Sequence, residues 1–185
     1  LEADRRRARF ALGRVSDDAE RLTRTFLSPA MRRANAQVGD WMREAGLVVR
    51  EDAVGNLIGR LAAASPKAPT FVVGSHLDTV RDAGRFDGPL GVLLRIAAVE
   101  ELRRRRVELP YSLEVVGFSE EEGVRFGSAY LGSKGYTGTL RARELALEAD
   151  RLQFGLGEID AVAPQLGEDE ALVADIRRLS ELDAL

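Results

Sequence analysis

The sequence predicts an α/β fold with a mainly parallel sheet and flanking helices. Two continuous apolar runs, Thr70–Gly74 and Leu113–Phe118, are typical of strands that are buried on both faces. The helical segment Pro89–Arg104 lies between them, with proline in its first turn. A strand, a helix and a second strand in this order form a crossover unit, which joins parallel neighbours. We therefore expect both runs to be central in the sheet, and the helix to pack on one of its faces.

The elements before this unit follow from helical spacing and from caps. A ragged helix is expected over residues 5–26, where apolar side chains recur at roughly helical steps: Leu12, Val15, Ala19, Leu22 and Phe26. A second helix is expected to begin at Ser28-Pro29 and to end near Gly46, because proline suits a first helical turn and glycine suits a C-terminal cap. Two short apolar runs follow it, Leu47–Arg50 and Leu57–Leu61, and they predict a pair of strands.

Residues 141–185 differ in character from residues 1–140, so we expect a divergent helical tail after the main domain. One helix is predicted over Arg141–Phe154, with a break at Gly155-Leu156-Gly157. An acidic helix is predicted over Glu168–Leu185, with an apolar stripe on one face: Leu172, Ile176, Leu179 and Leu182. We expect this stripe to fold back over the sheet or to pair with a second chain; the alternative is a disordered end.

Composition and charge limit the possible partners. The net charge of -3 gives no reason to expect nucleic acid, and no apolar run approaches the roughly 20 residues of a membrane span. The arginine run Arg103–Arg106 is better explained by a helix C-terminus, where cations complement the dipole. The N-terminus lacks the apolar core of a signal peptide, and cysteine is absent. We therefore expect a cytoplasmic protein, in which any metal binds to oxygen and imidazole ligands.

Three short stretches carry the residue types of a metal-dependent hydrolase: Gly74–Thr79, Gly84–Gly88 and Glu120–Gly123. The first contains His76, the only histidine, which is a candidate ligand for zinc or manganese, and Asp78, which is placed to orient the imidazole. The second contains Asp87, which could bridge two ions. In the third, one of Glu121 and Glu122 could bind a metal while its neighbour acts as general base towards water.

Each motif also has a structural interpretation. A single histidine is more often structural, Asp-Gly is usually a turn, and a run of glutamates is usually solvated. The combination favours a site, because the glutamates directly follow a buried strand. Carboxylates crowded there without a cation would repel one another.

The same residues resemble the M20 metallopeptidase family, and in particular its allantoate amidohydrolases, N-carbamoyl-L-amino-acid hydrolases and β-ureidopropionases. The similarity runs from about Val15 to Leu140 through a series of segments in the same order: Phe26–Ala30, Trp41–Leu47, Asp52–Arg60, Gly74–Val80, Gly84–Val92, Glu121–Phe126 and Leu131–Lys134. It implies a zinc-exopeptidase-like catalytic domain and hydrolysis of a non-peptide C–N bond in ureido or amidine compounds. It also implies a two-metal site, zinc or manganese, in which Asp87 bridges the ions, His76 and Glu122 bind one each, Glu121 is the general base and Asp78 orients His76.

The chain departs from this family in ways that affect activity. The family has two further histidine ligands and a dimerising lid domain that carries substrate-binding residues, whereas this chain has one histidine and no visible similarity past Leu140. We therefore expect an incomplete catalytic domain without a lid, weak metal binding, and little turnover unless a homo-oligomer or a complementing chain completes the site. The alternative function is a non-catalytic module that keeps the fold and serves interaction or structure.

Overall fold

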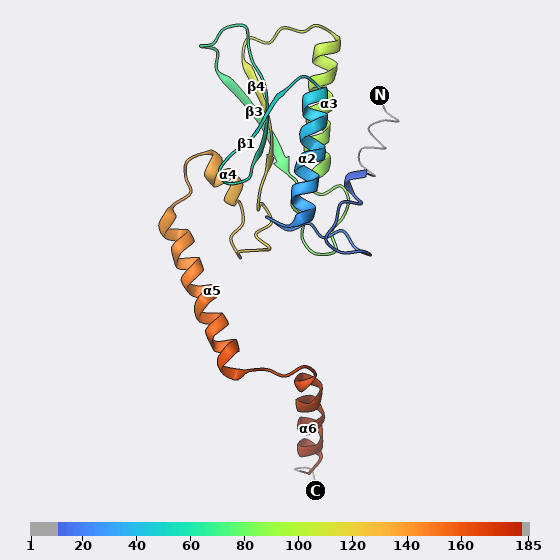
Figure 1. The fold of residues 1–185 in the computed structure, drawn as a ribbon, viewed down its shortest axis with the longest axis vertical. Helices are drawn as coiled ribbons and strands as arrows, with labels where there is room; N and C mark the ends of the chain where they lie inside the picture. The colour runs from blue at the N-terminus through green and yellow to red at the C-terminus, as the bar shows by residue number, and fades with distance from the viewer. Residues whose placement is uncertain (1–10, 183–185) are drawn as a thin grey trace. The chain divides into compact units, whose positions relative to one another are not determined.

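The computed structural model describes residues 11–182, which divide into two units after Leu140 (Figure 1). The first unit contains a four-stranded sheet in the order β1-β2-β4-β3. Its strands are β1 (Val48–Glu51), β2 (Leu57–Leu61), β3 (Thr70–His76) and β4 (Ser112–Phe118). All four strands were expected from their apolar runs, and the α/β class is confirmed.

The sheet is mixed, so the prediction of a mainly parallel sheet was wrong. β1 pairs antiparallel with β2, and β2 pairs antiparallel with β4. Only β3 and β4 are parallel, as the crossover through the intervening helix predicted. The short connection between β1 and β2 permits only an antiparallel hairpin, and this hairpin joins the sheet beside β4.

β3 lies at an edge of the sheet that the described residues form, which contradicts the expected central position of Thr70–Gly74. Its first three residues are exposed, and Phe71 keeps 54% of its surface accessible. β4 is the central strand that its apolar run predicted, with six of its seven residues buried. An apolar run indicates burial of side chains, but it does not specify how many neighbours a strand has.

Two helices pack against the sheet, α2 (Pro29–Glu44) on β1 and β2 and α3 (Pro89–Arg104) on β3 and β4. Both were predicted, and the Ser28 hydroxyl caps α2 by accepting a hydrogen bond from the Met31 amide. Figure 1 shows both helices on the same side of the sheet. Their apolar side chains form one core with alternate residues of the strands, including Val38, Met42, Val92, Ile96, Val99, Leu57 and Val115.

The opposite face of β4 contacts a short helix that was not predicted, α4 (Leu131–Tyr136). The ring of Tyr136 packs edge-on against Phe118, and its hydroxyl donates a hydrogen bond to Glu114 at 2.5 Å. Glu114 also accepts a hydrogen bond from Arg60 of β2 at 2.8 Å. Glu114 therefore connects β4 to α4 and to β2 through polar contacts on this side of the sheet.

The predicted helix over residues 5–26 was wrong from residue 13 onward; residues 11–12 are helical, and residues 5–10 lie outside the described part. Residues 13–26 form turns, bends and irregular segments. The Ser16 hydroxyl bonds to the backbone of Arg21 and Thr23, and the Asp18 carboxylate accepts from the Glu20 and Arg21 amides. Such local side-chain bonds compete with helical ones, and here they outweigh the apolar spacing.

The second unit contains α5 (Ala142–Val162) and α6 (Glu168–Leu182). The predicted break at Gly155-Leu156-Gly157 was wrong, because α5 continues through it; each glycine costs only about 1 kcal/mol relative to alanine. α6 agrees with the predicted acidic helix up to Leu182, and residues 183–185 lie outside the described part. Leu172, Ile176 and Leu179 of the predicted stripe are exposed. No described helix is long and apolar enough to cross a membrane.

Candidate metal centre

The candidate site forms where the parallel strands β3 and β4 end. His76 is the last residue of β3 and is paired with Phe118, the last residue of β4. The loops that leave these two strands therefore start at the same edge of the sheet, where open α/β sheets commonly bind ligands. The loop after β3 carries Asp78 and, just before α3, Asp87. The loop after β4 carries Glu120–Glu122.

The three predicted metal ligands lie together. His76, Asp87 and Glu122 each offer one ligand atom, and these atoms all lie within 4.8 Å of one another. Ligands of one zinc ion bind at about 2.0–2.2 Å, so two of them can be no more than roughly 4.4 Å apart. His76 Nε2 and Asp87 Oδ1, at 3.8 Å, already lie within this limit. The donor set of one imidazole nitrogen and two carboxylates fits a divalent ion.

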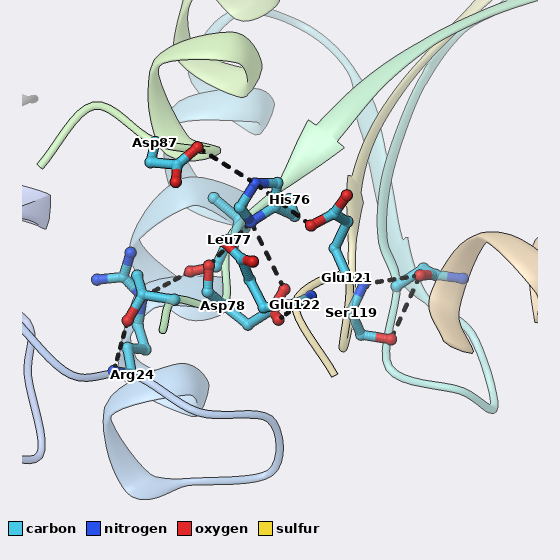
Figure 2. A network of polar contacts seen from close by, with 10 residues as sticks. Arg24, His76, Leu77, Asp78, Asp87, Ser119, Glu121 and Glu122 are labelled. Atoms are coloured by element: carbon cyan, nitrogen blue, oxygen red, sulfur yellow. Dashed lines mark hydrogen bonds and ion pairs between the residues drawn. The ribbon is translucent and has the colours of Figure 1, made fainter. Parts of the chain in front are cut away.

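The imidazole of His76 is oriented by the backbone of Asp78. Its Nδ1 atom lies 2.9 Å from the Asp78 carbonyl oxygen. A carbonyl can only accept, so Nδ1 must carry the proton and Nε2 is left free to bind a metal. The Nε2 atom lies 3.8 Å from Asp87 Oδ1 and 3.8 Å from Glu121 Oε2 (Figure 2). The orienting group is thus the main chain of Asp78, whereas the sequence pointed to its carboxylate.

The Asp78 carboxylate contacts the other loop of the site. Its Oδ2 atom accepts a hydrogen bond from the Glu122 amide at 3.2 Å, and its Oδ1 atom is buried without a partner. Asp78 therefore touches both His76 and Glu122, and it joins the end of β3 to the loop after β4.

Negative charge is crowded in this site. Burial raises the pKa of Glu122, and the charges of Glu121, Asp87 and Asp78 raise it further against the opposing effect of His76. Burial also raises the pKa of Asp78, although the Glu122 amide opposes this shift. Carboxylates held together at such a cost are relieved by a cation, which agrees with the donor set.

Glu120 has a different position from its two neighbours. It is fully buried, and its Oε1 atom accepts hydrogen bonds from the amides of Arg125 and Phe126. It therefore shapes the loop that follows β4 instead of facing the site. Glu121, the predicted general base, is 30% exposed and points its carboxylate towards Nε2 of His76.

Two supporting residues were missed by the sequence analysis. Asn56 is fully buried; its Oδ1 accepts from the Ser119 amide, and its Nδ2 donates to the Gly132 carbonyl and to Asp52. It thereby fastens the loop after β4 to the β1–β2 turn. Arg24, also fully buried, contacts the loop after β3. Asn56 lies in the turn segment Asp52–Asn56, which could have suggested a structural role, but nothing distinguishes Arg24 among 27 basic residues.

Gly88 is required by its proximity to the imidazole. It has a positive φ of 75°, and a β-carbon there would lie 2.5 Å from His76 Nδ1 and 2.7 Å from Nε2. The Asp-Gly pair is therefore part of the site as well as a turn.

Comparison with known proteins finds similarity to one peptidase family and to several amidohydrolases. Residues 72–173 match the sequence model described as peptidase family M20/M25/M40. Allantoate deiminase 1 of Glycine max is 42% identical over 144 residues, which are 77% of this chain and 30% of that protein. The N-carbamoyl-L-amino-acid amidohydrolase of Paenarthrobacter aurescens is 35% identical over 182 residues, which are 92% of this chain and 42% of that protein.

A solved structure is also similar. The crystal structure of a hydantoinase/carbamoylase family amidase from Burkholderia ambifaria gives a TM-score of 0.71 at 36% identity, covering 77% of this chain and 35% of that one. The chain thus spans about a third of the length of the proteins it matches. The family match continues to residue 173, so the expectation of no similarity past Leu140 was wrong.

Proposed function

The chain belongs to peptidase family M20/M25/M40, and we propose that it forms part of a metal-dependent hydrolase that cleaves non-peptide C–N bonds. The convergence of His76, Asp87 and Glu122 on one point supports this proposal most strongly. The proposed substrates are small ureido or carbamoyl compounds, namely allantoate or N-carbamoyl amino acids. These are the compounds after which two of the similar proteins are named.

The proposed roles follow from how each side chain lies. His76 would bind the first ion through Nε2, Glu122 the second, and Asp87 would bridge them. Zinc or manganese, when bound, supplies Lewis acidity to the substrate carbonyl and lowers the pKa of water. Glu121 would accept the proton of the attacking water, because its carboxylate lies beside Nε2 and remains partly open to solvent. Asp78 would hold the His76 ring and the Glu122 loop in place.

The chain supplies one imidazole for two ions, so we propose that ligands outside this sequence, in the same protein, a second copy or a complementing chain, complete the site. Weak metal binding and slow turnover of the chain alone follow from this proposal. The cytoplasm stays our predicted location for the protein.

The test measures zinc and manganese per chain by elemental analysis after dialysis at fixed free metal. His76→Ala and Asp87→Asn should each lower the metal content. Asp82→Asn is the matched control, because Asp82 is an exposed aspartate five residues before Asp87. Equal metal content in all four proteins would refute the assignment. Ammonia release from allantoate and from an N-carbamoyl amino acid then tests the chemistry, alone and with a complementing chain.

The second candidate function is an association module without catalysis. It is favoured by the exposed apolar residues of α6, Leu172, Val173, Ile176 and Leu179. Deleting residues 168–185 should then change the number of chains per particle, which light scattering measures. An unchanged number of chains per particle and unchanged solubility would count against this function.

A further inference from the structure

Arg24 is a buried charged residue beside the candidate metal centre. None of its surface is exposed to solvent. Burying an unpaired guanidinium costs several kcal/mol, so its position needs an explanation. Burial lowers the pKa of Arg24 to about 10, although the charge of Asp78 opposes this shift. The guanidinium therefore stays charged at neutral pH.

Arg24 contacts the residues immediately before and after Asp78 in the sequence. Its Nε atom donates to the Leu77 carbonyl at 2.7 Å. Its backbone exchanges two hydrogen bonds with Thr79: the Arg24 amide donates to the Thr79 hydroxyl, and the Thr79 amide donates to the Arg24 carbonyl, both at 2.9 Å. Arg24 thus holds both residues that flank Asp78, Leu77 through its side chain and Thr79 through its main chain. Figure 2 shows Arg24 beside Leu77 and Asp78.

The remaining donors fix Arg24 itself. The Nη1 atom donates to the carbonyls of Leu12 and Val15, at 3.0 and 2.9 Å. These bonds anchor the guanidinium in the turns before α2, so it cannot follow a movement of the loop after β3. The Nη2 atom is buried without a hydrogen-bond partner, a cost that a residue present only for packing would avoid.

Movement of this loop would reach the site through Asp78. The carbonyl of Asp78 holds Nδ1 of His76, and its carboxylate holds the amide of Glu122. We propose that Arg24 is a positioning residue for the metal centre, which fixes the Leu77–Thr79 backbone so that His76 presents Nε2 to the ion. The inference rests on the proposed metal site, but its effect on the imidazole does not require that a metal is bound.

The competing explanation is that Arg24 only ties down the turns before α2. Arg33 provides a control for this, because its Nη2 donates to the Ser16 carbonyl at 2.9 Å and so anchors the same segment without touching residues 77–79. A general loosening of the segment should appear in Arg33→Met, whereas an effect on His76 should be specific to Arg24 variants.

The experiment uses the single histidine of the chain, which gives unambiguous imidazole 15N signals. The tautomer is measured by two-bond 1H–15N correlation on metal-free protein, at a pH where the ring is neutral. The wild type and Arg33→Met should show the Nδ1–H tautomer. Arg24→Met should shift the population towards Nε2–H and weaken zinc binding by about 10-fold or more. Arg24→Lys retains the charge on a single nitrogen and should give an intermediate result.

The outcomes separate the positioning role from the proposed function. Folded Arg24→Met with an unchanged tautomer and zinc affinity overturns the positioning role and leaves the metal site standing. A tautomer shift in a chain whose wild type binds no zinc supports positioning and refutes the metal site. If Arg24→Met does not fold, Arg24→Lys decides by the same readouts. Failure of the lysine variant to fold as well would make Arg24 a general folding residue and would overturn the proposal.

Discussion

Substitution of Gly88 by alanine should disturb the candidate metal centre from its closest backbone contact. Gly88 precedes α3, with φ 75° and ψ -67°, which is the strained conformation of a γ-turn. An added methyl group would also contact the His76 ring at Cε1, Nδ1 and Nε2, with the two nitrogens at 2.5 and 2.7 Å. Ordinary contacts between such atoms are about 3.5–4.0 Å, so the ring or the loop must move by roughly 1 Å.

Two costs determine how much Gly88→Ala lowers the free energy of unfolding. A non-glycine residue at positive φ costs about 1–2 kcal/mol, and forcing a methyl group into a filled space costs about 1–3 kcal/mol more. Gly88→Ala should therefore lower the free energy of unfolding by roughly 2–5 kcal/mol. Gly138→Ala is a control without the contact, because Gly138 also has a positive φ, 69°, and nothing within 4 Å of an added β-carbon. It should incur only the backbone cost.

The assay is urea denaturation of metal-free protein followed by far-UV circular dichroism, with zinc affinity as a second readout. A larger loss of stability in Gly88→Ala than in Gly138→Ala, together with weaker zinc binding, is what the contact with His76 predicts. If Gly88→Ala is destabilised no more than Gly138→Ala and binds zinc like the wild type, the imidazole does not lie where we place it.

Two further predictions concern positions outside the site. Burial alone raises the pKa of Glu114, but hydrogen bonds from Tyr136 and Arg60 lower it overall, and Tyr136 has its pKa raised from 10.0 to about 12 by burial and by Glu114. The depressed carboxylate stabilises the fold above its unfolded pKa of about 4.3 and loses that effect as the pH falls through its lower folded value. The raised phenol stabilises the fold below pH 10 and loses that effect between pH 10 and about 12. Tyr136→Phe should cost about 1.5–3 kcal/mol at pH 7 in urea titrations and should flatten the alkaline limb; an unchanged alkaline limb would contradict the assignment. In α5, Gly155→Ala and Gly157→Ala should each stabilise the helix by about 0.8–1.0 kcal/mol, seen as higher helicity on heating, because neither β-carbon meets an atom within 4 Å. A loss of helicity in either variant would show that the helix does not continue through this segment.

The sequence by itself determined the elements of the crossover unit and the residue types of the site. Ser28-Pro29 fixed the start of α2, because a hydroxyl cap and a proline act within one turn. The apolar runs located all four strands, and the strand–helix–strand order placed His76 and Glu122 at the same edge of the sheet. These features depend on local chemistry and on the handedness of connections, both of which can be read from a single chain.

Tertiary structure alone decided features that depend on contacts between distant residues. The position of β3 at an edge and the antiparallel pairing of β2 with β4 depend on which strands find each other. The turns over residues 13–26 form because local polar bonds and Arg24 outweigh an apolar spacing that suggested helix. Asp78 orients His76 through its carbonyl, since the main chain, which no sequence pattern specifies, happens to lie closer to Nδ1 than the carboxylate does.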